Sequence, residues 1–353
     1  MAAIIPRIKQ HEHAPAWHSA LAQAIGSVGE LLDLLDIDPG LRPGPALTGN
    51  FPLRVPHSFA ARMETGNINN PLLRQVLPLP AEDADTAGYL PDPLIEYDAM
   101  PTPGLLHKYH GRALLTVTGA CAIHCRYCFR RHFPYSEANP LVTHRDTALA
   151  YLRSHGDISE VILSGGDPLV LPDDRLRELA TQLAAIPHIR TLRLHTRLPV
   201  VLPERVDSQL LDWVGNHPGR VVVVIHCNHP NEIDTGVTAA LKQLTLAGVT
   251  LLNQSVLLKG INDTAETLNA LSESLFAAGV LPYYLHQLDR VQGAAHFEVS
   301  DTRACELMQQ LHATLPGYLV PRLVREIPGL PGKWPLWPAR DSGGGMLDTD
   351  MVL

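Results

Sequence analysis

The chain has 353 residues, of which 45% are hydrophobic and 18% are charged, and its net charge is -8. This is the composition of a globular protein long enough to bury a substantial core in one or two domains. It contains no lysine- and arginine-rich run, and no apolar stretch reaches the roughly 18 residues that span a bilayer. Neither nucleic acid nor a membrane is therefore expected as a partner. Five cysteines in so long a chain do not form a disulfide framework, which favours a reducing cytoplasm.

The first 95 residues are predicted to form a helical, polar region interrupted by prolines. Within it, Leu21–Leu35 has apolar residues three and four positions apart, the spacing of one amphipathic helix. The stretch Asp92–Pro103 is proline-rich and typical of a linker. We therefore divide the chain into an N-terminal helical region (1–95), a central domain (96–317) and a C-terminal segment (318–353).

From residue 112 onward, apolar β-branched runs alternate with helical patterns. Strands are expected at Ala113–Val117, Val161–Leu163, Thr191–Leu194, Val221–Ile225, Thr250–Leu257 and Tyr283–Leu288. Helices are expected at Thr147–His155, Asp173–Ala184, Ser208–Val214, Val237–Ala247 and Ala265–Ala277. This alternation predicts an α/β fold with a parallel sheet and right-handed crossovers. Six repeats suit a partial (β/α)6 barrel, whose active site lies at the carboxyl ends of the strands, and an open doubly wound sheet is the alternative.

Three cysteines, Cys121, Cys125 and Cys128, follow the first of these strands with the spacing C-x3-C-x2-C. Three neighbouring thiolates form a soft-ligand pocket suited to an iron–sulfur cluster or to zinc. A four-iron cluster on three cysteines leaves one iron open to a small molecule, whereas structural zinc needs a fourth donor such as His124 or His132. The spacing favours the iron–sulfur cluster, with zinc or three unrelated thiols as alternatives.

Two further motifs contain residues that could approach a ligand or react with one. The strand at Val161–Leu163 runs into a Gly-Gly-Asp turn, whose glycines let the backbone approach a ligand, although an ordinary strand–turn–helix connection has the same pattern. Lys333 lies in an apolar loop rich in glycine and proline. A lysine held away from water becomes an amine nucleophile able to hold pyridoxal 5′-phosphate (PLP) covalently. The alternative for Lys333 is a surface lysine in a flexible loop.

These motifs, in this order, resemble the radical S-adenosylmethionine (SAM) superfamily and, within it, the lysine 2,3-aminomutase family. The resemblance covers residues from about 95 to about 335. Its matching stretches are His107-Lys-Tyr, Cys121 to Arg131, Ser164-Gly-Gly-Asp-Pro-Leu, Thr196-Arg-Leu-Pro-Val-Val-Leu-Pro, His226-Cys-Asn-His-Pro-Asn-Glu, Asn253-Gln-Ser-Val-Leu-Leu-Lys-Gly-Ile-Asn, Gln287-Leu-Asp-Arg-Val-Gln-Gly-Ala-Ala-His-Phe and Pro331-Gly-Lys.

The resemblance implies three cofactors. A [4Fe–4S] cluster is implied on Cys121, Cys125 and Cys128, with SAM on its open iron. PLP is implied on Lys333, within a short C-terminal PLP-lysine segment. The other implied cofactor-binding residues are Lys108 at the PLP phosphate, Gln254 near PLP, and Ser164, Gly165, Gly166 and Asp167 at the SAM-facing edge. Five residues at or near predicted strand ends are expected to line the barrel mouth, as ligand contacts or as structural hydrogen-bonding residues: His195, Arg197, His226, Asn228 and His229.

The resemblance also implies the reaction, the conversion of L-lysine to (R)-β-lysine. The resemblance matches Arg130 to the arginine that binds the α-carboxylate, and its planar guanidinium suits bidentate binding. Asp289 and Glu326 correspond to the two acids that hold the ε-ammonium, and the family has aspartate where Glu326 stands. A surface charge is the alternative for Arg130, and ordinary ion pairs are the alternatives for the two acids.

This short chain is most similar to family members whose product a separate ligase attaches to a lysine of elongation factor P. A flavodoxin or ferredoxin is the implied electron donor, and the N-terminal region is a candidate contact in a homo-oligomer. The alternative substrates are arginine and lysine already attached to elongation factor P. The rival classes are a radical SAM enzyme that modifies RNA or protein without PLP and a non-enzymatic iron–sulfur or zinc protein.

Overall fold

The structure is a computed structural model that describes residues 16–44, 51–133, 135 and 144–337. The expected regions 1–95 and 318–353 are therefore described only from residue 16, without 45–50, and up to residue 337. Among the described helices, none is both long enough and apolar enough to cross a membrane.

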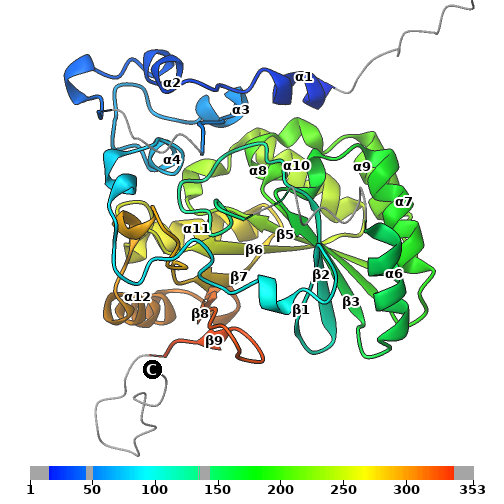
Figure 1. Ribbon diagram of the computed structural model, residues 1–353. Helices are drawn as coiled ribbons and strands as arrows, with labels where there is room; N and C mark the ends of the chain where they lie inside the picture. Colours follow the sequence, from blue (N-terminus) through cyan, green and yellow to red (C-terminus); the bar gives the residue numbers. More distant parts are fainter. Residues whose placement is uncertain (1–15, 45–50, 134, 136–143, 338–353) are drawn as a thin grey trace, which may run out of the picture.

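A single sheet organises the described residues (Figure 1). Its strands are β1 (Leu105–Tyr109), β2 (Arg112–Thr118), β3 (Glu160–Gly165), β4 (Thr191–Thr196), β5 (Arg220–His226), β6 (Thr250–Val256), β7 (Leu281–His286), β8 (Arg322–Arg325) and β9 (Trp334–Pro335). Neighbouring strands from β2 to β8 pair in parallel, while β1 and β9 are antiparallel edge strands. The strands lie in chain order and, within the described residues, β1 and β9 do not pair with each other. This order confirms the partial barrel and excludes the doubly wound alternative, whose strand order reverses at a switch point.

The six expected strands are all present, and β8 adds a seventh parallel strand that was not predicted. The connecting helices are α6 (Arg145–Ser154), α7 (Asp173–Ala184), α8 (Leu198–Val201), α9 (Ser208–Gly215), α10 (Thr235–Leu246), α11 (Ala265–Ala277) and α12 (Asp301–Thr314). The five predicted helices correspond to α6, α7, α9, α10 and α11. Several begin where a short polar side chain caps the first turn, as Asp207 does for α9 and Asp234 for α10.

The N-terminal region differs from the expectation of one long helix over Leu21–Leu35. Two short helices, α1 (Ala16–Ala22) and α2 (Val28–Leu34), take its place. Between them Ile25 leaves the helical path and pairs with Val55, and the hydroxyl of Ser27 caps α2. The predicted single helix is therefore wrong, because a long-range β-bridge and a new cap interrupt the apolar spacing.

Two more short helices, α3 (His57–Ala60) and α4 (Pro71–Arg74), complete the region, which lies over one end of the barrel (Figure 1). Trp17 and Phe59 belong to the same hydrophobic cluster as Leu163 and Val223 of the barrel strands. The backbone carbonyl of Gln75, at the end of α4, accepts a hydrogen bond of 2.9 Å from the backbone amide of Arg126. Arg126 belongs to the segment 121–131, called the cysteine run below. The N-terminal region thus packs directly against the segment that carries the cysteines.

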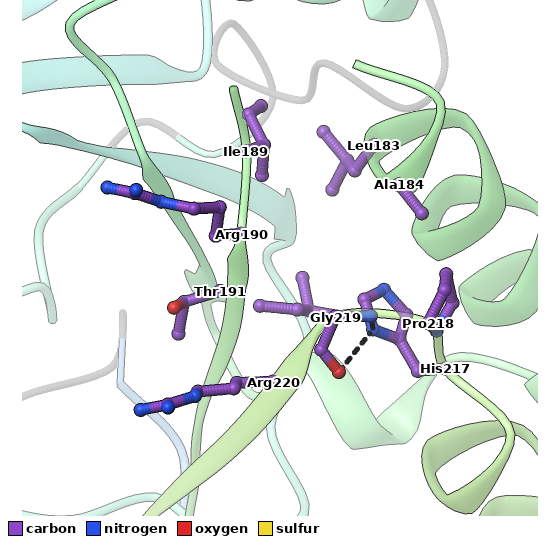
Figure 2. Close-up of a pocket in the computed structure, with 10 residues that line it drawn as sticks. Leu183, Ala184, Ile189, Arg190, Thr191, His217, Pro218, Gly219 and Arg220 are labelled. Atoms are coloured by element: carbon purple, nitrogen blue, oxygen red, sulfur yellow. Dashed lines mark hydrogen bonds between the residues drawn. The ribbon is translucent and has the colours of Figure 1, made fainter. Parts of the chain in front are cut away.

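The amino ends of β4 and β5 border a cavity of about 440 Å³, drawn in Figure 2. Arg190, Thr191, His217 and Arg220 line it, and the His217 imidazole lies 3.2 Å from the carbonyl oxygen of Gly219. None of the residues singled out from the sequence lines this cavity. It lies at the end of the strands opposite to the one where (β/α) barrels carry their active sites.

Candidate active site

A second cavity, of about 340 Å³, opens at the carboxyl ends of the strands. Every residue that the sequence assigned to a metal, a cofactor or the substrate lines it: Lys108, Cys121, Cys125, Cys128, Arg130, Ser164, Gly165, Gly166, Asp167, His195, Arg197, Gln254, Asp289, Glu326 and Lys333. His226, also expected at the barrel mouth, lines it too, whereas Asn228 and His229 do not. They come from β1, the cysteine run, the ends of β3, β4 and β6, and the loops after β7 and β8. Residues more than 220 positions apart in the sequence therefore face one space.

The Gly-Gly-Asp turn is packed against the loop that leads into the cysteine run. The backbone amide of Gly166 donates to the Thr118 carbonyl at 2.7 Å, and that of Asp167 donates to the Ala120 carbonyl at 2.8 Å. A Cβ atom at Gly165 would lie 2.4 Å from the Thr118 oxygen, and one at Gly166 would lie 2.1 Å from the Ala120 oxygen. The glycines are thus required for close approach of two backbone segments, which holds the cysteine loop on the end of β3.

The carboxylate of Asp167 is held by hydrogen bonds within the protein. Its carboxylate accepts hydrogen bonds from the Thr196 hydroxyl at 2.6 Å and from the backbone amides of Leu169, Arg197 and Leu198 at 2.7 to 3.1 Å. Asp167 therefore ties the turn after β3 to the end of β4.

The three thiols form an all-sulfur donor set at the cavity wall. Burial raises the pKa of Cys121 and raises that of Cys128 to about 11, and in each case a neighbouring cysteine of the run raises it further. In the part of the chain that the structure describes, no three cysteine, histidine or acidic side chains converge on a single metal ion. A four-iron cluster does not require such convergence, because each of its cysteines binds a different iron atom. The donor set and its access to the cavity therefore fit a cluster with one open iron.

A chain of alternating charges crosses the cavity from the cysteine run to the C-terminal loop. Glu96 accepts from Arg130 at 2.7 and 2.9 Å and lies 3.3 Å from the Lys108 ammonium. Glu326 in turn accepts from Lys108 at 3.0 Å and from Lys333 at 2.6 Å. The resemblance implies that Glu326 binds the substrate, and in the structure its carboxylate is shared by Lys108 and Lys333, the two lysines that the resemblance assigns to PLP.

Glu96 and Glu326, the two acids in this row of charges, are held ionised. Burial raises the pKa of Glu96, but Arg130 and Lys108 more than offset this, so its pKa lies below the ordinary value. For Glu326, Lys333 and Lys108 likewise outweigh the effect of burial and lower the pKa. Asp289 behaves differently: burial, with the Glu326 carboxylate beside it, raises its pKa to about 7. The two acids expected to bind an ammonium group thus differ in charge state near neutral pH.

Three histidines, His195, His226 and His286, line the same cavity. Burial lowers the pKa of each, assisted by nearby cations such as Lys333 beside His286. The Nε2 atom of His195 is buried and has no hydrogen-bond partner within the described residues. It is a free polar atom at the end of β4, which suits contact with a bound cofactor.

Sequence reasoning missed several residues of the site. Glu96, which holds Arg130, lies in the stretch that was expected to be a linker. Gln75 and Glu232 hold the guanidinium of Arg197, and both are buried. Arg112 lines the cavity with its guanidinium 4.7 Å from the Tyr109 ring, and within the described residues it has no carboxylate partner. An arginine without a carboxylate partner among the described residues, in the cavity that Lys108 and Lys333 also line, is the signal that marks Arg112, and it exists only in three dimensions.

Comparison with known proteins identifies the class and then the family. Residues 115–211 match the Radical SAM superfamily. The parallel sheet, the three cysteines at its carboxyl ends and this match define a radical SAM protein. Over 322 residues the chain is 51% identical to the L-lysine 2,3-aminomutase of Escherichia coli, covering 91% of this chain and 94% of that one. The enzyme of the same name from Haemophilus influenzae is 45% identical, over 93% and 96% of the two chains. This protein therefore belongs to the L-lysine 2,3-aminomutase family.

More distant matches are consistent with this assignment. The L-lysine 2,3-aminomutase of Clostridium subterminale is 34% identical over 91% of this chain and 78% of that one. Among solved structures, a radical SAM methyltransferase from Sphaerobacter thermophilus is 17% identical with a TM-score of 0.44, over 63% of this chain and 68% of that one. A likeness at that level carries no argument of its own.

Proposed function

We propose that this protein is a radical SAM, PLP-dependent lysine 2,3-aminomutase that converts L-lysine to (R)-β-lysine. One observation carries the proposal: the three cysteines, Arg130, Asp289 and Lys333 all line a single cavity at the carboxyl ends of the strands. A cluster, a carboxylate-binding cation, ammonium-binding acids and an amine nucleophile thus face the same space, as the reaction requires. The identity to enzymes of this name in E. coli and H. influenzae supports it.

The residues present suit the cofactors of the family. We assign the [4Fe–4S] cluster to Cys121, Cys125 and Cys128, SAM to the edge formed by Ser164, Gly165 and Gly166, and PLP to Lys333, with Lys108 and Arg112 at its phosphate and His195 and Gln254 beside it. When bound, these cofactors supply radical generation and electron delocalisation, while the protein supplies orientation and electrostatics. Asp167 and Arg197 act in this scheme by holding the turn and the cysteine run in place.

Arg130 is oriented to bind the substrate carboxylate. Glu96 occupies its Nε and one Nη2 position, and its Nη1 lies 3.3 Å from the Ser164 hydroxyl. A guanidinium has five N–H groups, so two remain for an incoming carboxylate. Because Glu96 fixes the guanidinium plane from one edge, the arginine does not have to be ordered when lysine binds.

The other end of lysine is proposed to meet Asp289 and Glu326. In the structure Glu326 is paired with Lys333 and Lys108. A phosphate group at Lys108 and loss of the positive charge on Lys333 would release Glu326 for the ε-ammonium. Glu326 would therefore link cofactor binding to substrate binding.

The finer assignments rest on the resemblance to the short members of the family. We propose that the product serves elongation factor P through a separate lysyl ligase, that a flavodoxin or ferredoxin donates the electron, and that the protein works in the cytoplasm. Its five free cysteines support a reducing compartment. A homo-oligomer contact through the N-terminal region is part of the same proposal.

An anaerobic assay with reductant, SAM, PLP and L-lysine tests this function, with β-lysine detected by mass spectrometry. Wild type is expected to form β-lysine, and Lys333→Ala is expected to form none while keeping its iron and losing the visible PLP band. Full turnover by Lys333→Ala would refute the assignment of PLP to this lysine. Cleavage of SAM without β-lysine would redirect the search to arginine and to lysylated elongation factor P, which are run as parallel substrates.

A further inference from the structure

Arg197 follows β4, and its guanidinium reaches the cysteine run. Its Nη1 lies 2.8 Å from the Sγ atom of Cys125 and 2.9 Å from the hydroxyl of Tyr127. Both distances are short enough for hydrogen bonds that Arg197 donates, so a charged N–H group points at one of the three cysteine sulfurs. Among the described residues, no other charged side chain donates a hydrogen bond to Cys121, Cys125 or Cys128.

Both terminal nitrogens of the guanidinium are held by hydrogen bonds. Its Nη2 donates to Gln75 at 2.6 Å and to the Glu232 carboxylate at 2.9 Å, and its charge lies 5.2 Å from the centre of the Phe59 ring. Arg197 is only 6% exposed. A buried guanidinium with fixed acceptors cannot swing away from the sulfur without leaving the Glu232 carboxylate unpaired, which is costly.

Glu232, the anchor of this arrangement, is itself fixed. It is fully buried, and its Oε1 accepts from the backbone amides of Asn228 and His229 at 2.9 and 3.1 Å and from the Gln75 amide at 3.0 Å. These contacts place the carboxylate at the carboxyl end of β5. The position of Cys125 is thereby coupled to two neighbouring strand ends, of β4 and β5, and to the N-terminal region.

We propose that Arg197 is a positioning residue for the iron–sulfur cluster that also sets its reduction potential through a charged hydrogen bond to the Cys125 sulfur. Reduction adds one electron to a cluster whose charge is shared by its sulfur ligands. A cationic N–H group at one sulfur stabilises the reduced form more than the oxidised form and raises the potential. This inference rests on the proposed function, because it requires the cluster on the three cysteines.

The test is a potentiometric titration of the anaerobically reconstituted full-length protein with dithionite, followed by electron paramagnetic resonance (EPR). Arg197→Met is expected to lower the midpoint potential by about 59 mV or more, which is a tenfold loss of the reduced form for a one-electron couple. Arg197→Lys, which keeps the charge without the planar fork, is expected to lie between this variant and wild type.

Arg62→Met is the matched control. Arg62 is a neighbouring cation whose Nη2 donates to the Val200 carbonyl at 2.6 Å and whose Nη1 donates to the backbone carbonyl of Glu232. Within the described residues it donates to none of the cysteines, so its replacement removes a cation beside the same glutamate without removing a contact to sulfur. Its removal is expected to leave the midpoint potential unchanged. An unchanged potential in Arg197→Met, or an equal shift in Arg62→Met, would overturn the proposal.

A measurement on the wild type covers the case in which Arg197→Met fails to load iron. In protein labelled with 15N-arginine, pulsed EPR of the reduced cluster is expected to detect a hyperfine coupling to an arginine nitrogen, and its absence would overturn the hydrogen bond. Failure of the wild type to assemble any cluster would instead refute the proposed function, so the two failures are distinguishable.

Discussion

At the scale of single residues, the two acids proposed to bind the ε-ammonium are not equivalent. Glu326 lies between two lysines and stays ionised, whereas burial beside Glu326 raises the pKa of Asp289 to about 7. A substrate ammonium would restore the charge of Asp289 on binding. Of these two acids, one therefore carries a permanent negative charge, and the charge of the other depends on pH and on the ligand.

This difference predicts an acid limb in the pH profile. Below about pH 7, Asp289 of the free enzyme is protonated and attracts the ammonium less, so kcat/KM for lysine is expected to fall, by up to about tenfold per pH unit. The limb in kcat should lie at lower pH, because bound ammonium lowers the pKa of Asp289. In Asp289→Asn we expect a lower kcat/KM at neutral pH and no such limb. A limb that persists unchanged in the variant would assign it to another group.

At the scale of elements, the turn after β3 explains how the cysteine run is aligned with the sheet. The amide of Gly166 and the missing Cβ atoms of Gly165 and Gly166 let the turn lie against Thr118–Ala120. The glycines thus act on the cluster through backbone packing, in addition to any approach to a ligand.

Gly166→Ala is expected to displace the cysteine loop, because its Cβ would lie 2.1 Å from the carbonyl oxygen of Ala120. Iron content after anaerobic reconstitution should fall several-fold. Gly156→Ala is the control: its added Cβ has no atom within 4 Å, and its effect on the free energy of unfolding should stay within about 0.5 kcal/mol. Normal iron loading in Gly166→Ala would show that the loop can shift without cost to the cluster site.

At the scale of the whole molecule, the N-terminal region and the cysteine run are joined by buried charges. Glu82 is fully buried and accepts from Arg126 at 2.5 and 2.8 Å and from Arg131 at 2.8 Å. Both arginines belong to the cysteine run. Burial raises the pKa of Glu82, but Arg126 and Arg131 outweigh it and the carboxyl stays ionised. The region before the barrel thus completes the environment of the cluster.

Glu82→Gln is expected to leave two buried guanidinium groups without their countercharge. Removing one partner of a buried ion pair lowers the free energy of unfolding by about 3–5 kcal/mol, and we expect iron to be lost faster from the variant. Denaturant unfolding and an iron-release assay measure the two effects. As a control, Asp212→Asn breaks the exposed Arg177–Asp212 pair and should change stability by less than about 1 kcal/mol. Equal losses in the two variants would contradict a special role for Glu82.

The sequence predicted the barrel strands and their helices well, because apolar runs and helical spacing are local signals. It missed β1, β8 and β9, which have only 5, 4 and 2 residues and acquire their identity by pairing with neighbours. It also missed the helices α8 and α12. It predicted one helix in place of α1 and α2, because the spacing of neighbouring apolar residues does not reveal a bridge between Ile25 and Val55, which lie far apart in the sequence. Of the cavity lining, it named residues whose roles stay predictions, and it missed Glu96, which holds Arg130, and Gln75 and Glu232, which hold Arg197.

By itself, the sequence determined the ligand types, the class and the family, since the spacing of three cysteines, the lysine loop and the ordered motifs are properties of the linear chain. The tertiary structure decided which partners those residues have. It paired Arg130 with Glu96, shared Glu326 between two lysines, and placed Arg197 against Cys125. Ionisation and hydrogen bonding depend on burial and on distances of a few ångströms, and only folding sets these between residues far apart in the chain.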